Sequence, residues 1–263
     1  MYILGLDIGS VFTKSALIKE RNIISYDTGY SHGDFQNSAS TVMASTFKKA
    51  NVSENEVFDI FSTGCGGEMV PRSKELLNDI SCQARGVNFL FPSIRTIIEI
   101  GARSTKVVKV NGRGSVVNFA VSERCAATSG KFLQLISRIT EIDIGKMGEV
   151  SLQSNKGVKF TTGCAVFAET EVISRIAEGI PVKDIVAGIH EIMAHKIFNL
   201  LQALNPEEGF AVTGGGAKDV GLIKAIENKL ATTIYIPPEP FITAALGAAL
   251  IGEEKTASKL ENV

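Results

Sequence analysis

The stretch DIGSVFTK (7–14) is repeated in outline by EIGARSTK (99–106), and the predicted fold follows from this pair. Both copies have one frame: an acidic residue, Ile, Gly, a small residue, two variable positions, Thr and Lys. The first copy lies between the apolar runs 3–7 and 14–18, and the second between 97–100 and 106–110. Short apolar runs bounded by Gly, Asn or Ser are typical of strands. Each copy therefore predicts a strand, a tight turn and a second strand.

The distance between the two copies is too long for a solenoid repeat and fits two related lobes. Elsewhere the pattern alternates between strand and helix. A strand is predicted before the glycine run 214–216, helical periodicity appears at 132–139 and 185–204, and a small-residue helix is predicted at 244–252. The charged residues after Gly252 are predicted to fray. We therefore expect an α/β protein made of two duplicated lobes.

Length and composition are those of an ordinary globular protein. The chain has 263 residues, of which 44% are apolar and 21% charged, with a net charge of −1. This charge gives no sign of nucleic-acid binding, and no run approaches the ~18 apolar residues of a membrane span. The first residues, MYILGLDIGS, start a strand and lack a basic region and a cleavage site. We expect a cytoplasmic protein that binds neither nucleic acid nor membrane.

The two repeated turns have the residue types of a phosphate site. Glycine lets backbone N–H groups approach an anion closely. Asp7 and Glu99 end their strands, where a carboxylate can hold Mg²⁺ or its water shell, and a lysine ammonium can bind phosphate oxygens. Two such hairpins facing across a cleft would hold a nucleotide, although two ordinary hairpins with solvated lysines would show the same pattern. The predicted nucleotide-binding residues are Gly9, Ser10, Lys14, Gly101, Ala102, Arg103 and Lys106.

A third glycine turn, TGGGAKDVG (213–221), follows a predicted strand and precedes a helix. Its backbone could contact a flat or anionic ligand such as the nucleoside. The predicted contacts are Gly214, Gly215, Gly216 and Lys218. A glycine run is also what a tight strand–helix turn requires, so both interpretations stand.

Two cysteines stand directly before helical patterns, in SERCAATSGKFLQ (122–134) and TTGCAVFAETEVIS (161–174). Two thiolates are half the ligand set of a [4Fe–4S] cluster, so a two-fold homodimer would complete a shared cluster on Cys125 and Cys164. A helix N-terminus would stabilise such an anionic group. The alternative is a pair of ordinary thiols. With no C-x-x-C pair, zinc is not expected, and no metal role is expected for His190 or His195.

The order GLDIGS…TK, IEIG…TK, TGGGAKDVG and AALGAALIG resembles the acetate and sugar kinase/Hsc70/actin ATPase superfamily. With RCAATSGKFL and CAVFAETEVIS, the chain is similar to the BadF/BadG/BcrA/BcrD ATPase family, in particular to the activators of (R)-2-hydroxyacyl-CoA dehydratases. The resemblance implies ribonuclease-H-like lobes at 1–90, completed by a C-terminal helix at 240–263, and at 91–239. It also implies that ATP and Mg²⁺ occupy a cleft between the lobes, with Asp7 and Glu99 as catalytic carboxylates.

The resemblance further implies an ATPase that couples ATP hydrolysis to one-electron transfer at low potential. Its homodimer would hold one bridging [4Fe–4S] cluster on Cys125 and Cys164. A ferredoxin or flavodoxin would supply the electron, and an iron–sulfur dehydratase or a related CoA-ester reductase component would accept it. Cys65 stands where the activators usually have an aromatic residue, so we expect it to be a plain thiol. Cys82 matches a family cysteine outside the cluster, so we expect it to be a core residue.

The chain departs from the activators in the second turn. They commonly carry Gly-Gly-Gln-Asp there, whereas this chain has Gly101-Ala102-Arg103-Ser104. Either hydrolysis is slower, or Glu99 and Arg103 take over part of the work, since arginine binds phosphate well. A solvated surface position for Arg103 is the equal alternative. Two other functions stay open: a small-molecule kinase of the same superfamily, for which no clear base is found, and a nucleotide sensor without redox chemistry.

Overall fold

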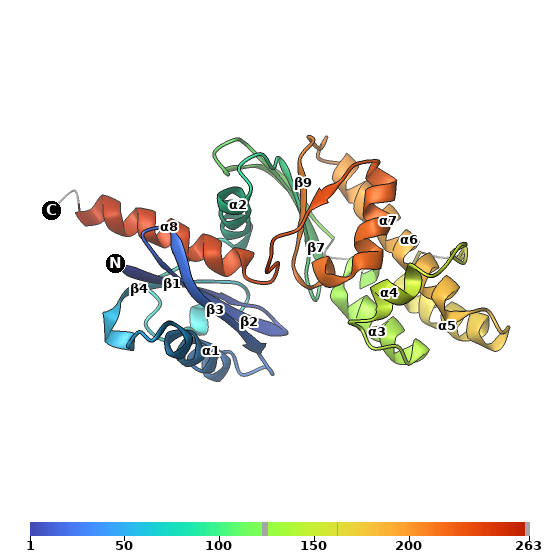
Figure 1. Cartoon of the computed structure of the whole chain (residues 1–263), viewed down its shortest axis with the longest axis horizontal. Coiled ribbons are helices and arrows are strands. Elements are labelled where there is room, and N and C mark those ends of the chain that lie inside the picture. The colour runs from blue at the N-terminus through green and yellow to red at the C-terminus, as the bar shows by residue number, and fades with distance from the viewer. Residues whose placement is uncertain (123–125, 162, 261–263) are drawn as a thin grey trace. The chain divides into compact units, whose positions relative to one another are not determined.

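The computed structural model describes residues 1–122, 126–161 and 163–260, and the chain forms two compact units (Figure 1). Unit 1 comprises Met1–Ile94, Val110–Val117 and Pro237–Val263, and unit 2 comprises Arg95–Lys109 and Asn118–Ile236. The strands make two five-stranded sheets, one mainly in each unit.

The sheet of unit 1 has the order β3-β2-β1-β4-β5. The first three strands are antiparallel, and β4 runs parallel to β1. The strands are β1 (Tyr2–Ile8), β2 (Phe12–Lys19), β3 (Asn22–Tyr30), β4 (Val57–Thr63) and β5 (Glu75–Leu76). The helices are α1 (Phe35–Ala50), α2 (Asp79–Leu90) and α8 (Thr243–Leu260).

Helices cover both faces of this sheet because its central strand is apolar on both sides. Leu4, Leu6 and Ile8 alternate along β1 and share a buried cluster with residues of α1. Ile3 faces the other way and packs with the alanines of α8. Since successive strand residues point to opposite faces, α1 and α8 lie on opposite sides of the sheet (Figure 1).

Helix α8 is longer than the sequence indicates. For the described residues 253–260 the prediction of fraying is wrong, because the charged end of the helix has partners in the same unit. Thr256 is buried and its hydroxyl donates to Asp59 Oδ2 at 2.7 Å. Lys255 pairs with Glu75. These contacts hold the last turns of α8 against the edge of the sheet.

Unit 2 repeats the strand order of unit 1. Its sheet runs β8-β7-β6-β9-β10 when read from the hairpin edge, with β6 antiparallel to β7 and parallel to β9. The duplication predicted from the repeated frames is confirmed. The strands are β6 (Thr96–Ile100), β7 (Thr105–Val110), β8 (Val116–Val121), β9 (Phe210–Thr213) and β10 (Ile234–Tyr235).

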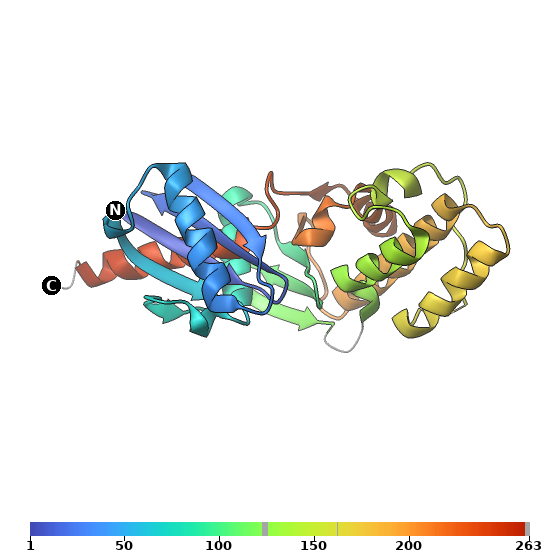
Figure 2. The ribbon, with the colours of Figure 1, turned by 90° about the horizontal axis from the view of Figure 1, so that it is seen from below.

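The two units differ in what joins the third strand to the fourth. Where unit 1 has α1, unit 2 has a helical insertion that packs with its sheet in one large buried cluster. Figure 2 shows the helices of this insertion gathered together. They are α3 (Gly130–Thr140), α4 (Met147–Ser151), α5 (Ala165–Ala177) and α6 (Val182–Gln202), and α7 (Val220–Leu230) follows β9. Within the described ranges, no helix is both long and apolar enough to cross a membrane.

Helices α2 and α8 approach each other closely through glycine. A Cβ built on Gly247 would overlap the carbonyl oxygen of Cys82, and one built on Gly86 would overlap the carbonyl oxygen of Thr243. Backbone lies directly on backbone at both places, so neither contact can be relieved by turning a side chain.

We expect Gly247→Ala to lower the free energy of unfolding by about 1–3 kcal/mol, the usual cost of overpacking a tight interior. Urea denaturation measures the loss. Ser258→Ala, on the exposed end of the same helix, serves as control and should change stability by less than about 0.5 kcal/mol. Equal denaturation midpoints for Gly247→Ala and wild type would contradict the close packing.

Candidate functional site

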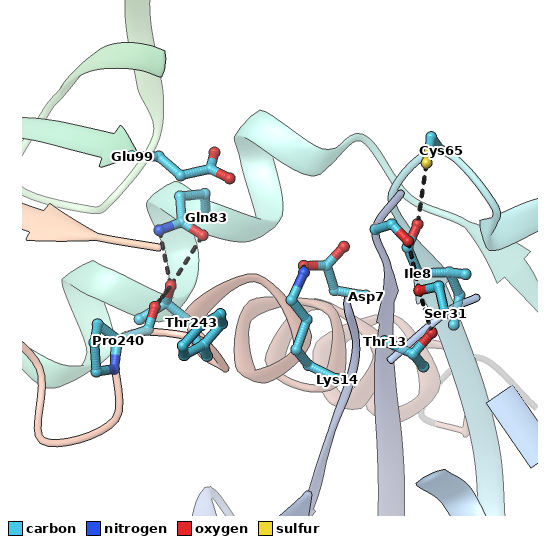
Figure 3. A network of polar contacts seen from close by, with 12 residues as sticks. Asp7, Ile8, Thr13, Lys14, Ser31, Cys65, Gln83, Glu99, Pro240 and Thr243 are labelled. Carbon is cyan, nitrogen blue, oxygen red and sulfur yellow. Dashed lines mark hydrogen bonds and ion pairs between the residues drawn. The ribbon is translucent and has the colours of Figure 1, made fainter. Parts of the chain in front are cut away.

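The first predicted turn joins β1 to β2, and its acid and lysine form an ion pair. Asp7 and Lys14 stand opposite each other in the antiparallel register, with Lys14 Nζ 2.8 Å from Asp7 Oδ2 (Figure 3). The N–H of Gly9 donates to Phe12 O at 3.0 Å and closes the turn. A Cβ on Gly9 would lie 2.9 Å from Lys14 Nζ. Glycine therefore lets the ammonium group lie against the turn, next to the half-buried Ser10.

A group of buried hydroxyl side chains is hydrogen-bonded to this turn and to one another. Ser31 Oγ donates to the carbonyl of Gly9 at 2.7 Å and lies 3.0 Å from Thr13 Oγ1 (Figure 3). Thr13 Oγ1 also lies 2.9 Å from Ser38 Oγ. Sequence reasoning did not assign these residues a role. The available signal was the threonine of the repeated frame, Thr13 and Thr105.

Cys65 lies beside the same turn. Its thiol is exposed and donates to the carbonyl of Ile8 at 3.5 Å (Figure 3). The preceding Gly64 approaches so closely that a Cβ there would lie 2.5 Å from Asp7 Oδ1. The loop after β4 therefore packs directly on the acidic end of β1.

The second turn has the same construction in unit 2. Glu99 and Lys106 are register partners, with Lys106 Nζ 3.1 Å from Glu99 Oε2. The N–H of Gly101 donates to Ser104 O at 3.0 Å and closes the turn. Ala102 is half-buried and Arg103 is exposed. In both turns the lysine lies against a carboxylate, which differs from the solvated lysines of an ordinary hairpin.

The third turn lies at the same end of the sheet strands as the second. Parallel pairing of β6 with β9 sets Glu99 beside Thr213, and both strands end there. Gly214 has φ 77°, and a Cβ on it would lie 2.5 Å from Ile100 O. Unit 2 thus brings together Gly101, Ala102, Arg103 and Lys106 with Gly214, Gly215, Gly216 and Lys218. Asp7, Gly9, Ser10 and Lys14 belong to unit 1.

A buried polar cluster anchors the end of the third turn. Asp219 Oδ1 accepts the N–H groups of Gly221 and Leu222 and so caps α7. Asp219 Oδ2 lies 3.1 Å from His190 Nε2, and His190 Nδ1 lies 3.0 Å from Ser151 Oγ. His190 is therefore a packed core residue. The cluster joins α4, α6 and α7, and its members are too far apart in sequence for a local pattern to reveal it.

Cys164 and Cys82 have opposite environments. Cys164 is exposed and stands at the N-cap position of α5, where a helix dipole favours negative charge. Cys82 is fully buried in α2, and burial raises the pKa of its thiol to about 12. Cys82 is a core residue, as predicted. Cys125 lies outside the described residues.

Helix α5, which follows Cys164, exposes large apolar side chains. Val166, Phe167 and Ile173 are 73%, 65% and 53% exposed. In the part of the chain that the structure describes, no group of three or more His, Cys, Asp and Glu residues could hold a metal ion.

Glu171 holds the loop that leads to Cys164. Its carboxylate accepts the N–H of Thr161 at 2.9 Å and the Thr161 hydroxyl at 2.9 Å, and Arg175 donates to it at 3.3 Å. Burial acts to raise the pKa of Glu171, but the bonds from Thr161 and the charge of Arg175 outweigh it and lower the pKa. Since the folded pKa is the lower one, this stabilisation is complete at neutral pH and is lost as pH falls through the lowered value.

We expect Glu171→Ala to release this loop and to raise the hydrogen-exchange rate of the Thr161 amide at least about tenfold at neutral pH, since charge-assisted bonds are lost. Glu178→Ala is the control, because Glu178 is an exposed partner of Arg175. An exchange rate in Glu171→Ala no faster than in Glu178→Ala would show that Glu171 does not hold the loop.

Comparisons with known proteins agree over nearly the whole chain. Residues 4–252 match the model of the BadF/BadG/BcrA/BcrD ATPase family. The chain is 34% identical to the 2-hydroxyisocaproyl-CoA dehydratase activator of Clostridioides difficile, over 100% of this chain and 99% of that protein. It is 32% identical to a benzoyl-CoA reductase polypeptide of Thauera aromatica, over 78% of this chain and 74% of that protein.

A solved structure is also similar throughout. The activator of the 2-hydroxyisocaproyl-CoA dehydratase from Clostridium difficile with bound ADPNP superposes with a TM-score of 0.94 at 33% identity, over 100% of this chain and 98% of that chain. The sequence comparisons and the structural comparison therefore indicate the same group of proteins.

Proposed function

The chain belongs to the BadF/BadG/BcrA/BcrD ATPase family, and we propose that it is an ATP-dependent activator that transfers an electron to an iron–sulfur partner enzyme. The family and the actin/Hsp70-like fold class predicted from the sequence are confirmed, and so is the enzyme class, an ATPase. The proposal adds a homodimer, a bridging [4Fe–4S] cluster and the direction of electron flow.

The main support for the proposal is the position of Cys164. It is exposed at the N-terminus of α5, in a chain that is similar over its full length to a dehydratase activator. Two cysteines per chain, Cys125 and Cys164, supply half the thiolates of a cubane cluster. The exposed apolar side chains Val166, Phe167 and Ile173 suit a surface that a second copy covers. When bound, the cluster would supply one-electron redox chemistry.

ATP and Mg²⁺ are proposed to bind at the three turns. Asp7 and Glu99, the proposed catalytic carboxylates, each lie within 3.1 Å of a lysine ammonium. A phosphate that replaces the carboxylate as the partner of Lys14 or Lys106 would leave that carboxylate available to Mg²⁺ or its bound water. The backbone of the glycine turn 214–216, which is followed by Lys218, is proposed to contact the nucleoside.

The side chains of the second turn differ from those common in the activators, but its closure does not depend on them. The N–H of Gly101 donates to the backbone carbonyl of Ser104, so the turn is closed without help from a side chain. The amide and acid common in the activators are absent, and Arg103 is exposed at the tip. Hydrolysis in this chain is therefore proposed to depend on Glu99 and on the charge of Arg103.

The proposed reaction moves one electron at a time. A reduced ferredoxin or flavodoxin gives up one electron in the cytoplasm, and the activator passes it to an iron–sulfur dehydratase or a CoA-ester reductase component. ATP can bias this transfer only by binding one conformation of the activator better than another. Hydrolysis then returns the protein to its starting state.

Anaerobic purification tests the cluster. We expect about four iron and four sulfide ions per dimer, and loss of both in Cys125→Ser and in Cys164→Ser. Cys65→Ser is the matched control, because Cys65 is also exposed but is not a proposed ligand. Colourless wild-type protein, or full iron content in either ligand variant, would refute the cluster assignment.

Asp7→Asn should retain iron but lower the ATP turnover rate about a hundredfold, the scale of losing a positioned acid–base group. Phosphate release measures the rate. Asp27→Asn changes another ion-paired carboxylate of the same sheet, 2.9 Å from Lys49, and should leave turnover unchanged. Wild-type turnover in Asp7→Asn would make this carboxylate purely structural.

A further inference from the structure

The second turn is hydrogen-bonded directly to the start of α3. The N–H of Gly130 donates to Gly101 O at 2.9 Å, and the N–H of Lys131 donates to Ala102 O at 3.0 Å. A Cβ on Gly130 would lie 3.4 Å from both Ala102 Cα and Gly101 O. Two consecutive carbonyls of the turn are thus held by two consecutive amides of the helix, so neither segment can shift alone without breaking bonds.

Side chains reinforce this junction on the strand that follows the turn. The hydroxyl of Thr105 donates to Thr128 O at 2.6 Å, and its backbone N–H donates to Ser122 Oγ at 3.0 Å. Ser122 Oγ in turn lies 2.7 Å from Thr128 Oγ1. Thr105 and Thr128 are 0% and 2% exposed. An unmade bond in such a buried place is costly, so Thr105 is the central side chain of the junction.

The equivalent threonine of unit 1 makes contacts of the same kind. Thr13 contacts Ser31, which follows β3, and Ser38, which lies in the first turn of α1. Thr105 contacts the corresponding segment of unit 2, namely Ser122, which follows β8, and Thr128. In both units the threonine of the repeated frame thus bonds to the segment after the third strand, and in unit 2 this segment leads into the insertion that carries Cys164.

Packing continues from α3 to the cysteine. Leu133 and Ile136 of α3 share one buried cluster with Ala168 and Val172 of α5. The N–H of Ala168 donates to the carbonyl of Cys164 at 2.9 Å. Buried side chains therefore connect α3 with the first turn of α5.

We propose that this junction, with Thr105 as its positioning residue, makes the exposure of Cys164 respond to a nucleotide phosphate at the second turn. The inference rests on the proposed function, because it assumes that nucleotide binds there. A turn that closes on a phosphate must move the carbonyls of Gly101 and Ala102, and the junction moves α3 with them. Contiguous bonds and packing are a physical route for such coupling, and only a coupling measurement establishes it.

The test uses cluster-free full-length protein and a non-hydrolysable ATP analogue with Mg²⁺. Iodoacetamide labelling of Cys164 is followed by mass spectrometry of the peptide 160–175, with and without the analogue. In wild type we expect the labelling rate to change at least about fivefold, the lower end of allosteric coupling. In Thr105→Val the change should fall below about twofold while the analogue still binds. Thr105→Ser keeps the hydroxyl and should retain the response.

Thr96→Val is the matched control. Thr96 is a fully buried threonine of the neighbouring strand β6, and its hydroxyl donates to Glu207 O at 2.8 Å, outside the junction. This variant should respond like wild type. Should Thr105→Val fail to fold, Ser122→Ala removes the half-buried partner of both Thr105 and Thr128 and should abolish the response in the same way.

The possible failures are distinguishable. If the analogue binds wild type but leaves the labelling rate unchanged, or if Thr105→Val responds like wild type, the inference is overturned while the proposed function stands. If calorimetry shows no binding of the analogue to wild type, the proposed function fails and the inference fails with it.

Discussion

An ion pair between an acid and a lysine, fixed across a hairpin, is the constraint on which both candidate nucleotide turns depend. Asp7 with Lys14 and Glu99 with Lys106 have the same geometry in separate units, with all four side chains between 14% and 20% exposed. Desolvation offsets much of the attraction in such partly buried pairs. The duplication sets both pairs at equivalent positions, where we propose that phosphate and Mg²⁺ bind.

The duplication provides two equivalent turns but gives them different surroundings. The strand order is the same in both sheets, so each turn lies at the end of a central strand. Hydroxyl side chains support the turn in both units, but they lead into α1 in unit 1 and into the helical insertion in unit 2. That insertion also carries Cys164 and anchors the third glycine turn through His190 and Asp219. Its helices share one buried cluster with the sheet of unit 2, and close-packed interiors can pass displacement from one element to the next.

Features that depend on local pattern could be predicted before the structure was known. The repeated frame predicted two hairpins, periodicity predicted α3 and α6, and the resemblance of the motifs predicted the family. Helix α1 was not recognised, because residues 35–50 are rich in Ser, Thr and Lys, which obscures the helical period. The extension of α8 was missed for a related reason, since residues of β4 and β5 stabilise its charged end.

Contacts between residues far apart in the chain required the folded structure. Thr13 and Thr105 occupy the same place in the repeated frame, yet one contacts Ser31 and the other Thr128. His190 likewise meets its aspartate only through the packing of α6 against α7. A local pattern records the period at which side chains face the core, but a hydrogen bond depends on the direction and position of two groups brought together by the whole fold. The turns could therefore be predicted from the sequence, whereas the distant residues that hydrogen-bond to them could not.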